Sequence, residues 1–85
     1  MRGEMINKIT RSPLFVKQTK KLDDFLLKKL KAQIAKILEN HFVGKPLKYT
    51  RGERTLYIKP FRLIYAIKVN ELILLKFDHR KRVYK

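Results

Sequence analysis

The fold of this 85-residue chain is decided by one stretch, LDDFLLKKLKAQIAKIL at residues 22–38. Leucine or isoleucine recurs at every fourth position of this stretch, and lysines lie between them. That spacing places the apolar side chains on one face of an α-helix and the lysines off that face. Asp23 or Asp24 can open the helix, because a carboxylate there lies at the positive end of the helix dipole. The stretch therefore predicts a long amphipathic helix that ends near residues 40–42.

A short strand and a short helix are predicted before the long helix. Residues 5–10 alternate weakly between apolar and polar side chains, as a strand does. Ser12 and Pro13 then form a helix start, since the serine hydroxyl accepts orphan N–H groups and proline has no donor to lose. We expect the short helix at residues 14–21.

Beyond the long helix the apolar period changes to two, which indicates strands. Gly44 and Pro46 mark an exit loop, because neither residue continues a helix well. The predicted strands are residues 55–59, 61–69 and 72–77. The pair Asn70-Glu71 favours a tight hairpin between the last two strands, and their nearly continuous apolar runs suit central strands covered by helices.

These elements predict a single α+β domain over residues 1–85. Its order is β-α-α-β-β-β, with the two N-terminal helices packed on an antiparallel sheet. Phe15 and Phe25 are expected in the core of this domain.

The charge balance narrows the class of partner. Lys and Arg total 22 against 7 Asp and Glu, which gives a net charge of +15. A surface this basic favours a polyanion, so we expect nucleic acid or an acidic protein as the partner. Binding to nucleic acid should weaken steeply as salt rises.

The composition also limits the chemistry and the location. There is no cysteine, and the only histidines are His41 and His79, so no metal and no other cofactor is expected. The first ten residues lack the pattern of a signal peptide, and no segment has the roughly twenty apolar residues that span a bilayer. We therefore expect a cytoplasmic protein with no membrane partner.

Four short motifs, taken in order, resemble the RelE/ParE toxin superfamily. They are GKPL at residues 44–47, RTLYI at residues 54–58, FRLIY at residues 61–65 and HRKRVY at residues 79–84. The family pattern is a leucine-rich helix pair, a GKPL-type loop, a strand with a YRLIY-like run and a C-terminal HRxxVY. The resemblance spans Ser12 to Tyr84, which is nearly the whole chain.

The resemblance implies a RelE-like microbial RNase fold and a toxin of a type II toxin–antitoxin pair. RelE-type toxins are ribosome-dependent endonucleases that cut messenger RNA without a metal and so inhibit translation. The implied partners are the ribosome, messenger RNA and an acidic RelB-like antitoxin that wraps the basic surface. One alternative is a ParE-type toxin, which keeps the fold, lacks the RNase residues and inhibits DNA gyrase. Another is a non-catalytic RNA- or ribosome-binding protein, which charge alone would explain.

Metal-free cleavage of RNA requires a deprotonated 2′-hydroxyl, a stabilised phosphate and a protonated leaving oxygen. Arginine suits the second task, since its planar fork meets two phosphate oxygens and stays charged. Arg62 matches the strand arginine of the family, and Arg80 matches the arginine of its C-terminal motif. Because Arg62 stands on a strand otherwise suited to burial, a salt bridge to Asp78 or Glu53 is the alternative interpretation.

The resemblance assigns the remaining site residues. Tyr84 matches the family's terminal tyrosine, an acid, base or stacking group, although its ring could instead pack on the sheet. Lys59 is expected to support catalysis as the only cation on an exposed face formed with Thr55 and Tyr57. Family members carry more cations there, and this departure favours the ParE-type alternative. The expected substrate-binding residues are Tyr57, Arg54, His79, Lys81 and Arg82.

His79 is also a candidate proton shuttle, since an imidazole gains and loses a proton near neutral pH. A two-histidine mechanism would require His41 as well. That residue stands at the end of the long helix, where histidines more often act as caps or dipole partners.

Overall fold

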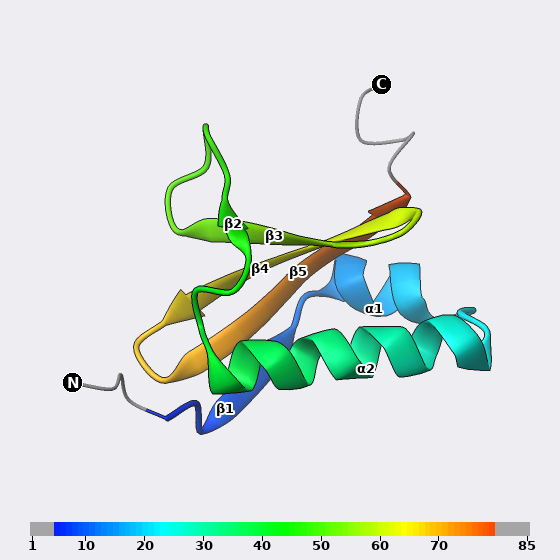
Figure 1. Ribbon diagram of the computed structural model, residues 1–85, viewed down its shortest axis with the longest axis horizontal. Helices are drawn as coiled ribbons and strands as arrows, with labels where there is room; N and C mark the ends of the chain where they lie inside the picture. Colours follow the sequence, from blue (N-terminus) through cyan, green and yellow to red (C-terminus); the bar gives the residue numbers. More distant parts are fainter. Residues whose placement is uncertain (1–4, 80–85) are drawn as a thin grey trace.

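The computed structural model describes residues 5–79, in which two helices pack on one five-stranded sheet (Figure 1). The helices are α1, Pro13–Thr19, and α2, Asp24–Glu39. The strands are β1, Lys8–Arg11; β2, Lys45–Pro46; β3, Glu53–Ile58; β4, Phe61–Lys68; and β5, Glu71–His79. The predicted α+β fold class is confirmed. The structure adds the short strand β2, which lies in the segment expected to be only a loop.

Both helices begin at capping residues that the sequence indicates. The Ser12 hydroxyl accepts a hydrogen bond from the Phe15 N–H at 2.9 Å and donates one to the Leu75 carbonyl at 2.7 Å. The Asp23 carboxylate accepts a hydrogen bond from the Leu26 N–H at 2.8 Å. Ser12 therefore starts α1 and also ties it to β5, so one side chain sets both the helix boundary and its docking.

The strand order across the sheet is β1-β5-β4-β3-β2. The pairs β2–β3, β3–β4 and β4–β5 are antiparallel. β1 pairs parallel to β5, with Lys8 opposite Glu71 and Arg11 opposite Leu74. The sheet is thus mostly antiparallel, as predicted. The parallel pair was not predictable from turn chemistry, because β1 and β5 lie far apart in the sequence and no hairpin joins them.

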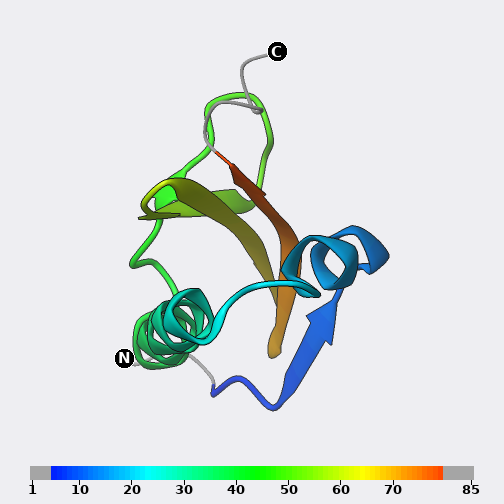
Figure 2. The ribbon, with the colours of Figure 1, turned by 90° about the vertical axis from the view of Figure 1, so that its right-hand side faces the viewer.

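The helices and the sheet share one apolar core. α1 contributes Phe15, and α2 contributes Leu30 and Ile37, each at most 3% exposed. β4 turns Leu63 and Tyr65 toward the helices, and both side chains are fully buried. Figure 1 shows both helices below β3, and Figure 2 shows α2 and α1 on either side of the first part of β5. The alternate residues of β3 and β4 therefore face away from the helices.

Phe25 departs from the expected core. Its side chain is 67% exposed, and the Lys29 ammonium lies 4.5 Å from its ring centroid. One residue along an α-helix is a rotation of about 100°, so Phe25 is turned away from the stripe that contains Leu26 and Leu30. Phe15, in contrast, is buried as expected.

The β4–β5 hairpin turns at Val69 and Asn70, one residue earlier than the predicted Asn70-Glu71. Val69 carries the positive φ, 57°, a conformation that is rare for a β-branched residue. Glu71 begins β5 instead, where it pairs with Lys68 and accepts a hydrogen bond from the Thr10 hydroxyl. These contacts explain why Glu71 is a strand residue and not a turn residue.

No helix within residues 5–79 combines the length and the apolar character needed to cross a membrane.

Candidate active site

The face of the sheet that points away from the helices carries the candidate site. Tyr57 on β3 lies opposite Arg62 on β4, and Thr55 lies opposite Ile64. On the other side of β4, Asp78 of β5 lies opposite Arg62. Cross-strand neighbours point to the same face, so these side chains form one surface.

Arg62 is held at the centre of this surface. Its side chain is 9% exposed, and its guanidinium carbon lies 5.6 Å from the ring centroid of Tyr57, which is 48% exposed. Burial and stacking restrict the rotamers of a long side chain, so the planar fork is presented in a defined place. A guanidinium held in this way can bind two oxygens of one phosphate.

Asp78, the cross-strand neighbour of Arg62, is positioned by α1. The Gln18 amide nitrogen donates a hydrogen bond to the Asp78 carboxylate, and its oxygen accepts one from the Phe77 N–H at 2.7 Å. Gln18 thus satisfies the free edge of β5 beyond the end of β1. No sequence motif singles out this glutamine, because its role depends on a contact across some sixty residues.

The register of the strands shows which of the two candidate carboxylates, Asp78 or Glu53, lies next to Arg62. Asp78 lies directly across β4–β5, whereas Glu53 pairs with Ala66 at the other end of β4. Ala66 is four residues from Arg62, which is about 13 Å along a strand. Of the two alternatives, only Asp78 is a neighbour of Arg62.

Lys59 lies beside this surface in the β3–β4 turn, where the Lys59–Pro60 peptide bond is cis. A hollow of about 590 Å³ there is lined by Tyr57, Lys59, Pro60 and Phe61. A second hollow, of about 330 Å³, lies between the β3 end and α2, and Tyr57 and Lys59 line it together with Lys29 and Gln33. Tyr57 and Lys59 therefore belong to both hollows, which extend from the Arg62 surface toward the lysines of α2.

Thr55 corrects the expectation of an exposed Thr55–Tyr57–Lys59 face. It is only 6% exposed, because Lys45 of β2 and Ile64 of β4 flank it on the two sides. The open part of the face is confined to Tyr57 and Lys59.

Arg54, expected to bind substrate, is engaged on the other face of β3. Its Nε donates a hydrogen bond to the Gly44 carbonyl at 2.8 Å, and its guanidinium carbon lies 5.0 Å from the ring centroid of Phe42. Its cross-strand neighbour is Tyr65, whose hydroxyl donates to the His41 carbonyl at 2.9 Å. Arg54 therefore fastens the segment after α2 to the sheet, away from Arg62.

The two histidines lie beside different parts of β4. His79 is the cross-strand neighbour of Phe61, and their ring centroids are 5.3 Å apart. His41 is held through its carbonyl by Tyr65, four residues further along, or about 13 Å. The two-histidine mechanism therefore lacks the geometry it needs. His79 itself lies on the helix side, beside Gln18, Phe77 and Asp78 around a hollow of about 170 Å³.

The C-terminal motif supplies the remaining predicted residues. Arg80, Lys81, Arg82 and Tyr84 lie outside the described residues, and their roles stay predictions. Within residues 5–79, no group of three or more histidine and acidic side chains is placed to hold a metal ion.

Comparison with known proteins identifies the class. Residues 9–84 match the model of a family described as the ParE toxin of the type II toxin–antitoxin system parDE. No curated protein matches the chain significantly. The match covers most of the chain, so the chain belongs to this family, within the RelE/ParE superfamily of type II toxins.

Solved structures share the fold. The RelE toxin in the RelB–RelE complex of Methanococcus jannaschii is 19% identical, with a TM-score of 0.73 over 88% of this chain and 94% of that one. The isolated E. coli RelE toxin is 17% identical, with a TM-score of 0.77 over 91% and 89%. A chain of the E. coli DinJ–YafQ toxin–antitoxin complex is 19% identical, with a TM-score of 0.73 over 92% and 97%. At these identities the likeness is one of fold, and it is the fold of RelE.

Proposed function

We propose that this toxin is a ribosome-dependent endoribonuclease that cuts messenger RNA without a metal ion. The observation that carries the proposal is Arg62, an arginine held on the helix-free face of the sheet with its guanidinium against the partly exposed ring of Tyr57. Only 9% of Arg62 is exposed, so the 48% exposed ring of Tyr57 marks the side from which a phosphate would reach the guanidinium.

In this mechanism Arg62 stabilises the charge that grows on the phosphate as the 2′-oxygen attacks. Tyr57 orients the guanidinium and can stack on an exposed base, and Lys59 lies at the adjoining hollow to meet a neighbouring phosphate. The resemblance assigns Arg80 as a second cation on the phosphate and Tyr84 as the acid, base or stacking group. Lys81 and Arg82 complete the proposed RNA-binding set, and His79 belongs to it only if RNA also reaches the helix side of the sheet.

The partners follow from the same proposal. The solved RelE relatives form complexes with RelB antitoxins. We infer an acidic antitoxin for this chain too, because a surface of net charge +15 is neutralised most simply by a protein of opposite charge. A helix or strand of the antitoxin would cover Arg62 and Arg80. The ribosome, messenger RNA and a cytoplasmic setting belong to the proposal as well.

A ParE-type toxin acting on gyrase is the second candidate. The observation that favours it is the scarcity of cations beside Arg62: within residues 5–79, Lys59 is the only lysine that lines the hollow of Tyr57, Pro60 and Phe61. A toxin that inhibits by binding alone needs no group to move protons.

Expression of the chain in cells separates the candidates. We expect growth arrest with translated messages cut within codons, and plasmid supercoiling unchanged at early times. Arg62→Ala should abolish both arrest and cutting, whereas Lys68→Ala, which removes one exposed charge from the same strand, should not. Early loss of supercoiling with intact messages would support the gyrase alternative, and arrest by Arg62→Ala equal to that of the parent would refute the nuclease.

A further inference from the structure

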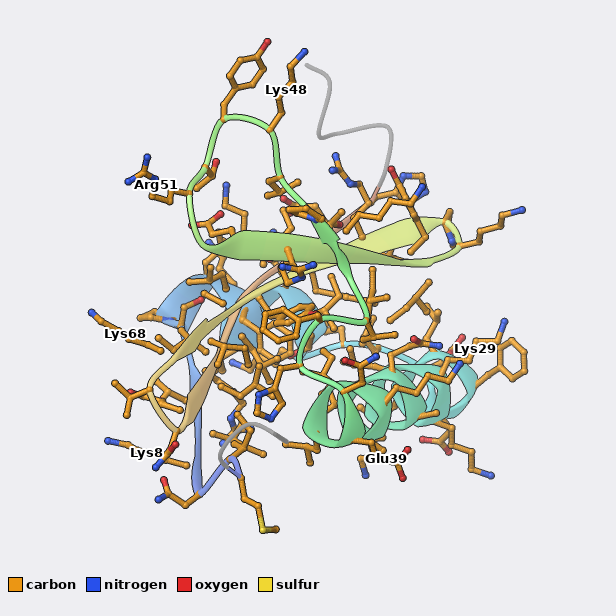
Figure 3. The ribbon with its side chains drawn as sticks, turned by 60° about the vertical axis from the view of Figure 1, so that its left-hand side comes forward. Lys8, Lys29, Glu39, Lys48, Arg51 and Lys68 are labelled. Atoms are coloured by element: carbon orange, nitrogen blue, oxygen red, sulfur yellow. The ribbon has the colours of Figure 1, made fainter. Side chains whose placement is uncertain are left out.

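The loop between β2 and β3, residues 47–52, is the other feature of the molecule that suggests a contact with nucleic acid. At its tip Tyr49 is 89% exposed, the highest value among the large apolar and aromatic side chains of residues 5–79. The Lys48 ammonium lies 5.5 Å from the centroid of the Tyr49 ring. Arg51 is exposed on the other arm of the loop, and Figure 3 shows Lys48 and Arg51 directed outward from it.

The loop is built as a defined projection. The Leu47 N–H donates to the Glu53 carbonyl at 2.9 Å, which closes its base, and the Glu53 N–H donates to the Thr50 carbonyl at 3.3 Å. Gly52 takes a φ of +84°, a conformation that glycine adopts freely and that turns the chain back into β3. The side chains at the tip are therefore carried on a closed hairpin that contributes almost nothing to the core.

The loop also projects from the side of the sheet that bears Arg62. Figure 1 shows it rising from the sheet on the side opposite the helices. From Glu53, where the loop joins β3, to Tyr57 is four residues, or about 13 Å of strand. A short stretch of extended RNA whose phosphate lies at Arg62 can follow β3 to the loop.

We propose that this loop is a second RNA contact, in which Tyr49 stacks on one unpaired base while Lys48 and Arg51 bind the phosphates on either side. An exposed aromatic ring between two cations matches single-stranded nucleic acid, because every base offers a flat face and every linkage a negative charge. An acidic peptide would satisfy the two cations but would leave the ring with no flat partner. The inference rests on the proposed function in taking RNA as the target, and it adds a site outside the proposed catalytic residues.

The chain contains no tryptophan, which provides a direct test. Tyr49→Trp, made in an Arg62→Ala background so that RNA is not cut, places the only indole of the protein at the loop tip. Titration with a single-stranded RNA oligonucleotide should quench its fluorescence strongly, and an RNA duplex should quench it much less, because paired bases are not free to stack. The matched control is Phe25→Trp on α2, where the native ring is 67% exposed and also has a lysine over it; this indole should not be quenched.

Affinity gives a second measurement. Tyr49→Ala should weaken binding of single-stranded RNA by about 5- to 150-fold, the range expected for one lost stack, and Tyr49→Phe should restore most of it. Since the side chain lies in solvent, circular dichroism of Tyr49→Ala should match that of the parent. Unchanged affinity in Tyr49→Ala, or equal quenching at positions 49 and 25, would overturn the proposal. Quenching by a polyglutamate peptide and not by RNA would assign the loop to a protein partner and would also overturn it.

These measurements need neither ribosomes nor cleavage, so they fail separately from the nuclease proposal. If the protein never cuts RNA but the indole at position 49 is quenched by single-stranded RNA, the proposed loop contact stands and the nuclease proposal is wrong. If the parent cuts messages and Tyr49→Ala binds RNA as tightly as the parent, the nuclease proposal stands and the proposed loop contact is wrong.

Discussion

Gly44 stands where a side chain would collide with the sheet. A Cβ atom there would lie 2.9 Å from the Thr55 carbonyl oxygen and 2.9 Å from both Cε1 and the hydroxyl of Tyr65. All three atoms belong to buried groups that cannot move aside easily. The glycine of the GKPL motif is therefore explained by close packing, and not by backbone conformation, since no positive φ is found at Gly44.

Gly44→Ala should lower the free energy of unfolding by about 2 kcal/mol, the usual cost of overfilling a packed site. Urea denaturation followed by circular dichroism measures the change. Gly52 is the matched control: it has a φ of +84° but nothing within 4 Å of its Cβ position. Gly52→Asn should therefore be tolerated, since asparagine accepts positive φ, whereas Gly44→Asn should be worse than Gly44→Ala. Equal effects of asparagine at both glycines would contradict the packing explanation.

Tyr65 is a second residue whose contribution to stability depends on one atom, its hydroxyl oxygen. Its buried hydroxyl accepts a hydrogen bond from the Gly44 N–H at 3.0 Å and donates one to the His41 carbonyl at 2.9 Å. Tyr65→Phe leaves both backbone groups without this partner, so we expect a loss of about 2 kcal/mol of stability. Thermal unfolding should show a clear fall in Tm for Tyr65→Phe and almost none for Tyr57→Phe, whose ring is half exposed. A Tyr65→Phe variant as stable as the parent would contradict this role of the Tyr65 hydroxyl.

At the scale of the elements, the two helix caps differ in what they hold. Asp23 caps α2 with one hydrogen bond, whereas Ser12 caps α1 and also donates to the Leu75 carbonyl of β5. Replacing Asp23 by alanine should cost about 1 kcal/mol and replacing Ser12 by alanine about 2 kcal/mol, because the second change also removes a hydrogen bond between the start of α1 and β5. Chemical denaturation of the two variants gives the comparison, and a larger cost at Asp23 would contradict the docking role of Ser12.

The caps also show which elements could be predicted from sequence. Ser12 and Asp23 act on N–H groups three residues away, so the sequence alone indicates where the helices begin. The alternation of side chains along residues 61–68 also indicates that Arg62 lies on the other face of the strand from Leu63 and Tyr65, as it does in β4. Such predictions succeed because the signal and the structure lie in the same short segment.

The elements that escaped prediction depend on distant parts of the chain. β2 exists because Lys45 pairs with Thr55 and Pro46 pairs with Arg54, and no periodicity is visible in two residues. Gln18 reaches β5 across the fold, and Arg54 serves the segment after α2, a role that its place in a motif did not reveal. The alternation of side chains along each strand predicts which face of the sheet Arg62 and Tyr57 occupy. It does not predict that their side chains are in contact, because that depends on the register of β3 and β4.

At the scale of the whole molecule, the net charge of +15 should dominate RNA affinity. The logarithm of the binding constant should fall linearly with the logarithm of the salt concentration, by roughly 0.7 for each neutralised phosphate of a single strand. The double variant Lys48→Gln/Arg51→Gln should reduce that slope by roughly 1.4 if both cations of the loop bind phosphates. Fluorescence anisotropy at several salt concentrations measures the slope.

The control for this measurement is a second double variant of equal charge, Lys8→Gln/Lys68→Gln. Figure 3 shows both lysines below the loop, with Lys68 at mid-height and Lys8 near the lower end of the molecule. Their removal should weaken RNA binding only slightly and leave the slope unchanged. Equal slopes for the two double variants would mean that RNA responds only to the net charge of the protein and that Lys48 and Arg51 make no specific phosphate contacts.

The most direct test of the central claim is cleavage of a defined messenger RNA on purified ribosomes, mapped by primer extension. The account predicts that the parent and Lys68→Ala cut the message within the codon being decoded, and that naked RNA is cut poorly. We expect the rate of cleavage by Arg62→Ala to fall by a factor of about 100 or more, because the variant lacks one group that stabilises the charge on the phosphate. Cleavage by Arg62→Ala at the rate of the parent would contradict the account.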